Sequence, residues 1–214
     1  MLHMSSSFYR GEIGYSGFHQ FSLKSGLFNL GEGINEGYTE LLRHRYFITE
    51  NDGFESYMYE IDTADKIEKI TGKEKMESLY LNADLPWLIQ ELKQFSSEEA
   101  IIKFISDVDF IFKYLDEKKF KLFEKGTITN QLKGINRFLI ETYSRKLLLQ
   151  YQQNSINYEQ IITLLSKYNS SLISTLRIGK KDYEILSGDD LIESIETVFG
   201  KSGSLILIKR KFYF

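Results

Sequence analysis

The hexapeptide NEGYTE at residues 35–40 gathers polar side chains that could carry chemistry in this 214-residue chain. Glu36 and Glu40 are four residues apart, so they share a face if the segment is helical. Two like charges at that spacing weaken an isolated helix by about 0.2–0.5 kcal/mol. A cation or a hydrogen-bonding partner beside the pair would explain it. His3, near the start of the sequence, could supply a nitrogen ligand to such a cation.

An ordinary helix start is an equally good interpretation of these residues. Asn35 is a residue type that favours the N-cap position. The carboxylates of Glu36 and Glu40 would complement the positive end of the helix dipole. His3 alone is typical of an unstructured terminus. Spacing by itself therefore leaves the two interpretations open.

The hexapeptide resembles the N-E-x-x-[ST]-[DE] element of the glutamate zincins, or gluzincins, which are thermolysin-like metallopeptidases. In that family the Glu is the third zinc ligand, and the final acid supports a ligand histidine. The resemblance implies that Glu36 is a zinc ligand. It also implies that Glu40 orients a histidine ring through its other nitrogen, with Asn35 beside it outside the ligand set. His3 would be the second histidine of an H-E-x-x-H motif, and small bacterial proteins of this type show a similar arrangement.

The first His and the Glu of H-E-x-x-H would stand before Met1. The first is a zinc ligand, and the second is the general base that activates the zinc-bound water. A catalytic zinc takes about three protein ligands, so we expect this chain to bind Zn²⁺ weakly or not at all. The chain is predicted to be a truncated or degenerate zinc metallopeptidase-like protein, inactive by itself. Peptide or protein hydrolysis is expected only where the upstream His-Glu is present.

The remaining polar residues of this region have less specific interpretations. In a chain without the first histidine, Glu40 would turn to Arg43, His44 or solvent. His44 is predicted to be a surface histidine, and His19 a packed or loop histidine among aromatic residues. The family often stabilises the reaction's oxyanion with a further His or Tyr, for which His19, His44 and Tyr15 stay open as candidates.

A non-enzymatic helical module that binds a protein or peptide in a groove between helices is the alternative function. The formal net charge of −3, with basic and acidic residues interleaved, argues against a nucleic-acid partner. No apolar run approaches the roughly 18 residues of a membrane span, so no membrane partner is expected. The absence of cysteine excludes a thiolate nucleophile and cysteine-ligated zinc. Without a signal-peptide pattern, a cytoplasmic location is expected.

The elements that would position these residues are predicted to be mainly α-helical. Proline breaks helix interiors, and the chain contains only one, Pro86, so long helices are permitted. The predicted fold is a multi-helical bundle of seven or eight helices that resembles the helical C-terminal half of a zincin. Residues 8–31 predict a loop-rich region with one or two short strands and a hairpin around residues 14–18. A second small hairpin is expected near the C-terminus. Residues 1–47 are predicted to be the remnant of the metal-site region, and residues 48–214 a helical domain.

Helix signals define the predicted boundaries. Apolar spacing starts a helix at residue 34, with Asn35 available as its N-cap. Asp84 and a Ser96–Glu99 capping box mark two further helix starts, and Gly72 marks a helix end. The other predicted helices cover residues 54–71, 73–82, 84–95, 96–120, 127–153, 157–175 and 188–199, with short strands in 176–186 and 204–214.

Overall fold

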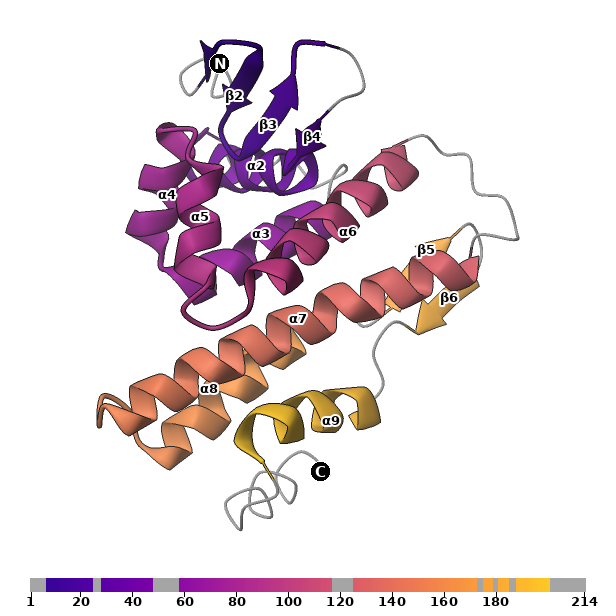
Figure 1. Ribbon diagram of the computed structural model, residues 1–214. Helices are drawn as coiled ribbons and strands as arrows, with labels where there is room; N and C mark the ends of the chain where they lie inside the picture. Colours follow the sequence, from indigo (N-terminus) through magenta and orange to yellow (C-terminus); the bar gives the residue numbers. More distant parts are fainter. Residues whose placement is uncertain are drawn as a thin grey trace. The chain divides into compact units, whose positions relative to one another are not determined.

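A computed structural model describes residues 7–24, 28–47, 58–116, 125–172, 175–178, 181–184 and 188–200. By its internal contacts the chain divides into two compact units, residues 1–125 and residues 126–214 (Figure 1). The predicted mainly α class is confirmed, since the described residues form eight helices and two small antiparallel sheets. The predicted division after residue 47 stays a prediction.

The first unit opens with a four-stranded antiparallel sheet in the order β1-β2-β3-β4. Its strands are β1 Ser7–Arg10, β2 Ile13–Ser16, β3 His19–Ser22 and β4 Asn29–Leu30. The hairpin predicted around residues 14–18 is confirmed, with Gly17 at a φ of 54° in its turn. The region holds more strands than the one or two predicted, because strands this short leave little alternation in a sequence rich in glycine and aromatic residues.

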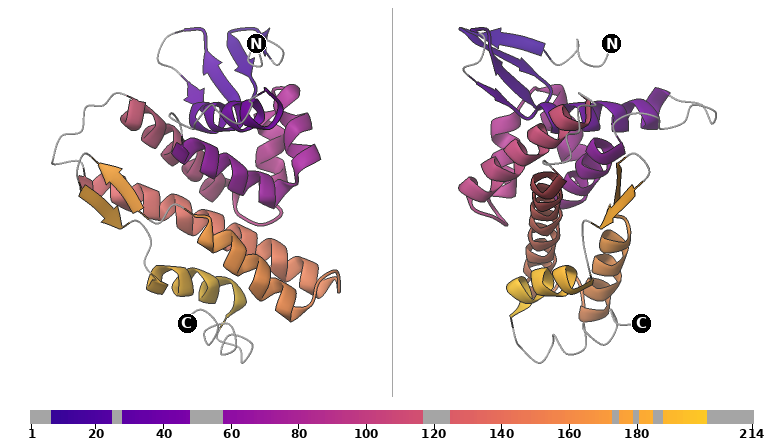
Figure 2. Two further views of the ribbon diagram at one scale, coloured as in Figure 1. Left: turned by 180° about the vertical axis from the view of Figure 1, so that it is seen from behind. Right: turned by 90° about the vertical axis from the view of Figure 1, so that its right-hand side faces the viewer.

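Five helices complete the first unit: α2 Glu32–Phe47, α3 Met58–Thr71, α4 Lys73–Leu81, α5 Leu85–Leu92 and α6 Glu98–Asp116. Helix α2 packs against α3 and α6, and strand β3 lies on α2 (Figure 2). The predicted helix end at Gly72 and the Asp84 cap are confirmed, the latter by a 3.1 Å hydrogen bond from the backbone N of Trp87. Helix α6 is capped one residue later than predicted, because Ser97 Oγ accepts from the backbone N of Ala100.

The predicted N-cap role of Asn35 is wrong. Helix α2 begins at Glu32, and the backbone N of Asn35 already donates to the carbonyl of Gly31 at 2.9 Å. The cap comes from another helix. Asp109 of α6 accepts hydrogen bonds from the backbone N of Gly31 at 2.7 Å and of Gly33 at 2.9 Å. A carboxylate that arrives from a distant part of the chain therefore fixes the start of α2.

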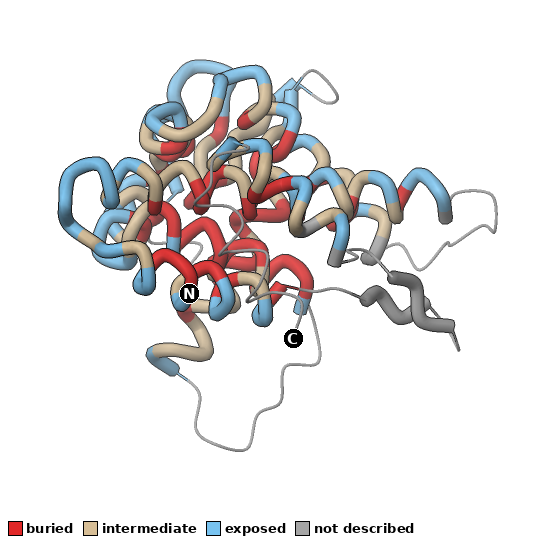
Figure 3. Tube along the Cα trace, turned by 90° about the horizontal axis from the view of Figure 1, so that it is seen from below, coloured by how far each residue is buried: buried red, intermediate tan, exposed pale blue. Residues whose placement is uncertain are grey.

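Buried residues of α2, among them Ile34 and Tyr38, belong to the core of the first unit. Figure 3 colours the buried residues red along the Cα trace. The rings of Phe18, Tyr38 and Tyr80 form a buried cluster with centroids 5.3–5.6 Å apart. Tyr38 Oη donates to Glu68 of α3 at 2.9 Å, and Arg45 donates to the same carboxylate at 2.8 Å. Burial raises the pKa of the Tyr38 hydroxyl, which stays protonated and can keep donating.

The second unit contains α7 Lys125–Gln152, α8 Tyr158–Ser170, the hairpin of β5 Thr175–Ile178 and β6 Lys181–Glu184, and α9 Gly188–Phe199. The rings of Tyr143 and Tyr168 stack at 4.1 Å between α7 and α8. Arg137 of α7 pairs with Glu193 of α9 at 2.7 Å. The strand predicted in residues 204–214 lies outside the described residues. None of the helices in the described ranges has the length and apolarity needed to cross a membrane.

The cap at Asp109 predicts a specific pH dependence of stability. Burial raises the pKa of this carboxyl from 3.8 to about 6, although its two backbone hydrogen bonds oppose the shift. Because the pKa of Asp109 is higher in the folded state than in the unfolded state, the folded state binds more protons at pH values between these two pKa values. Relative to Asp109→Asn, the free energy of unfolding should therefore rise by about 2 kcal/mol as pH falls from 7 to 4.

Urea unfolding of the wild type and Asp109→Asn across this pH range measures the effect. Glu98→Gln, at an exposed position near the start of the same helix, is the control and should not alter the pH profile. A difference between wild type and Asp109→Asn that stays constant with pH would contradict the prediction.

Candidate functional site

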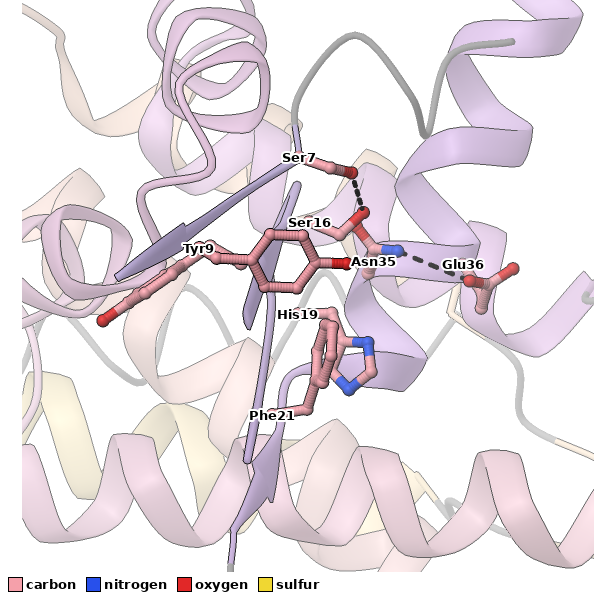
Figure 4. A pocket seen from close by; sticks show the side chains of 8 residues that line it. Ser7, Tyr9, Ser16, His19, Phe21, Asn35 and Glu36 are labelled. Carbon is pink, nitrogen blue, oxygen red and sulfur yellow. Dashed lines mark hydrogen bonds between the residues drawn. The ribbon is translucent and has the colours of Figure 1, made fainter. Parts of the chain in front are cut away.

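A pocket of about 390 Å³ lies between the four-stranded sheet and the first turns of α2 (Figure 4). Its walls are Ser7, Tyr9, Tyr15, Ser16, His19, Phe21, Asn35 and Glu36. This volume falls in the range of about 300–1,000 Å³ typical of sites for small ligands. The pocket contains Glu36, which the sequence singled out, and His19, which the sequence predicted to be a packed or loop residue.

The strand register explains why these side chains meet. Directly paired residues of antiparallel strands point to the same face, so one row is Ser7, Ser16 and His19 and the next is Tyr9, Gly14 and Phe21. A Cβ at Gly14 would collide with the ring of Phe21. Glycine at this position therefore lets the Phe21 ring lie across strand β2, where it also contacts the His19 ring at a centroid distance of 4.9 Å.

Asn35 attaches the sheet to the helix. Its side chain is 2% exposed, and its Oδ1 accepts a hydrogen bond from the backbone N of Phe18 at 3.0 Å. The approach is so close that a Cβ at Gly17 would collide with the same oxygen. Asn35 Nδ2 makes a long 3.4 Å hydrogen bond to Glu36 Oε1. Asn35 thus positions the pocket walls, and its predicted place outside a zinc ligand set stays a prediction.

The hexapeptide divides into an inward and an outward set. Thr39 is buried, and its Oγ1 donates to the carbonyl of Asn35 and shares a 2.7 Å hydrogen bond with Tyr80 Oη. Glu36 is half-buried on the pocket wall. Glu40, one turn further along, lies outside the pocket lining and accepts from Arg43 Nε at 2.7 Å. The sequence predicted that Glu40 would turn to Arg43, His44 or solvent, and in the structure it is hydrogen-bonded to Arg43.

The described residues do not fit a zinc ion by themselves. His3, the second predicted ligand, lies outside the described ranges, so its predicted closeness to Glu36 stays a prediction. Within those ranges, no three His, Asp or Glu side chains are grouped so that they could hold a metal ion. The described chain offers Glu36 as one carboxylate at the pocket, where a catalytic zinc needs about three protein ligands.

His19, which the sequence left open as one of three oxyanion-stabilising candidates, lies in the pocket lining. Its Nε2 is hydrogen-bonded to Asn29 Oδ1, and Asn29 Nδ2 donates to Glu32 Oε2 at 2.9 Å. The only local signal was the two-residue spacing from His19 to Phe21, which puts both rings on one face of a strand. Finding the site required the strand register and the contact with α2, and neither can be read from local spacing.

Comparisons with protein-family models, with curated proteins and with solved structures find no match for this chain.

The anchoring role of Asn35 predicts a local effect of its removal. Asn35→Ala would leave the buried backbone N–H of Phe18 without its acceptor, at a cost of about 1–3 kcal/mol. We expect faster hydrogen exchange at the Phe18 amide and a lower free energy of unfolding. Asn35→Asp keeps the accepting oxygen and should preserve most of the protection.

Asn82→Ala is the matched control, because the side chain of Asn82 is exposed and donates to the nearby carbonyl of Ser78 at 2.8 Å. Unchanged exchange at the Phe18 amide in Asn35→Ala would show that other contacts hold the sheet on α2.

Proposed function

We propose that this protein is a metallopeptidase-like protein of the gluzincin type, in which Glu36 is the carboxylate ligand of a zinc site. The supporting observation is the placement of Glu36 on the wall of a pocket, at the start of a helix whose neighbouring positions are fixed. Asn35 is tied to the sheet, and a Cβ at Gly37 would collide with the carbonyl of Glu60. A carboxylate at this point can face a ligand without disturbing the core.

The proposal needs partners that the described residues do not provide. His3 and the first His of the H-E-x-x-H motif would complete the ligand set, and the Glu of that motif would accept the proton from water. Zn²⁺ is the implied cofactor, and a peptide or protein is the implied substrate. Glu40, paired with Arg43 on the outward face of α2, would turn to support a ligand histidine. The cysteine-free sequence suits the cytoplasm that the proposal assumes.

Zinc binding and proteolysis test this proposal together. The 214-residue chain should bind Zn²⁺ weakly in equilibrium dialysis and should not cleave casein. A chain extended by His-Glu directly before Met1 should bind one Zn²⁺ tightly and show proteolysis that a chelator stops. Glu36→Ala should abolish both properties of the extended chain, whereas Glu12→Ala, at an exposed position in the turn between β1 and β2, should abolish neither.

Tight zinc binding and proteolysis by the 214-residue chain would contradict the need for the upstream pair. An extended chain that folds and binds zinc without cleaving peptides would favour the second candidate.

The second candidate is a module that binds peptides without cleaving them. The specific observation in its favour is the composition of the pocket lining, in which the described residues include three aromatic residues, two serines and the carboxylate of Glu36. Strand β1, which lies at the edge of the described sheet, is exposed along its whole length beside the pocket. The sequence predicted a groove between helices, whereas this pocket lies between the sheet and α2.

A further inference from the structure

The hydrogen-bond chain behind His19 fixes its tautomer. Glu32 can only accept hydrogen bonds, so the amide group that Asn29 presents to it must be Nδ2. Asn29 therefore turns Oδ1, which also only accepts, toward His19 Nε2. The proton of this hydrogen bond must come from the imidazole. A neutral His19 thus carries its hydrogen on Nε2 and a lone pair on Nδ1.

The lone pair on Nδ1 belongs to a ring that lines the pocket. Among the described residues, the contacts of His19 are its hydrogen bond to Asn29 and its ring contact with Phe21, and neither uses Nδ1. Figure 4 shows the His19 ring beside Phe21, with Glu36 on the neighbouring helix. A neutral His19 therefore offers the pocket a hydrogen-bond acceptor.

The other polar atoms of the lining favour the same kind of ligand. Glu36 contributes a carboxylate, which carries negative charge and only accepts. Among the described residues, none that lines the pocket is a lysine or an arginine. Ser7 donates to Ser16 at 2.9 Å, so one hydroxyl hydrogen is already used within the wall. A ligand that carries positive charge and donates several hydrogen bonds matches these acceptors, whereas an anion does not.

Pocket size and aromatic surface distinguish an organic cation from a metal ion. The described residues lack a group of three metal donors, and about 390 Å³ far exceeds the space of one ion. The rings of Tyr9 and Phe21 provide surface for a carbon chain, and a cation over an aromatic face gains about 0.5–1 kcal/mol at exposed sites. Guanidinium or ammonium on an apolar stem fits both features.

We propose that the pocket binds the basic side chain of a peptide, with arginine preferred. In this arrangement Glu36 pairs with the guanidinium, His19 Nδ1 accepts one of its N–H groups, and the Phe21 ring packs against the stem. Arginine is preferred over lysine because its planar group donates in several fixed directions, which suits two separate acceptors. The inference rests on the second candidate function and names the class of residue that such a module recognises.

Isothermal titration of the 214-residue chain, in the presence of a chelator, tests the charge requirement. The probes are N-acetyl-arginine amide and N-acetyl-citrulline amide, which have nearly the same shape but differ in charge. We expect the arginine probe to bind at least about tenfold more tightly, which corresponds to about 1.4 kcal/mol. Glu36→Gln should remove this preference. Glu40→Gln, on the same helix but outside the pocket lining, should retain it.

Nitrogen NMR of the histidine ring tests the tautomer separately. His19 in the neutral state should show a protonated Nε2 and an unprotonated Nδ1. Asn29→Ala should mix the two tautomers and weaken binding of the arginine probe severalfold, although Glu36 is untouched. Amide spectra of each variant establish that it is folded. A wild-type ring protonated on Nδ1 would overturn the role assigned to His19.

The possible outcomes separate this inference from the functions on which it depends. Equal affinity for arginine and citrulline probes overturns the inference, and the peptide-binding module survives if extended peptides with either residue bind. Tighter binding of an arginine-containing pentapeptide than of free arginine supports a peptide ligand, whereas the reverse order assigns the pocket to a free cation and overturns the peptide assignment. Failure of every probe, combined with zinc-dependent cleavage by the extended chain, rejects the module and leaves the metallopeptidase.

Discussion

The hydrogen bond from the backbone N of Phe18 to Asn35 Oδ1 is the constraint on which the pocket depends. It joins the turn between β2 and β3 to the first turns of α2. His19 directly follows Phe18 in the sequence, and Glu36 directly follows Asn35. Gly17 permits the approach because any Cβ there would collide with Asn35. Leaving the buried amide of Phe18 without this hydrogen bond would cost free energy. One position of the sheet on α2 is therefore favoured. The imidazole and the carboxylate reach the same space as a consequence.

The orientation of α2 about its own axis is fixed by polar contacts at both ends. Asp109 accepts the first backbone N–H groups, and Arg45 near the last turn binds Glu68 of α3. Such contacts specify one orientation more strictly than apolar packing, since each partly buried group would be left unsatisfied in any other. Between them, Ile34 and Tyr38 enter the core and Glu36 faces the pocket. The polar contacts of Asp109 and Arg45 thus help to hold the Glu36 carboxylate at the pocket.

The sequence correctly predicted helix ends and starts that depend on contacts between residues close together in the chain. Gly72 and Asp84 end and begin helices through contacts within a few residues, and both were correctly read from the sequence. The N-cap assignment of Asn35 failed because the true cap, Asp109, lies 76 and 78 positions away from the N–H groups it accepts. The sequence kept His19 as one of three open candidates for stabilising an oxyanion, and it could not fix the place of His19 for a related reason. Its importance comes from strand register and from Asn29, ten residues along the chain, and spacing rules do not encode such contacts.

The two candidate functions differ in what faces Glu36, and the geometry around the carboxylate is common to both. A metal site requires nitrogen ligands in addition to Glu36, and the resemblance assigns these to His3 and to the residues before Met1. A guanidinium site requires only further acceptors and apolar surface, and His19, Tyr9 and Phe21 already lie around the pocket. Because both cations would use the same carboxylate, zinc bound to the extended chain should displace the arginine probe. Glu36 would then bind a cation in either case. The residues opposite it would decide whether that cation is a catalytic zinc ion or the guanidinium of a bound peptide.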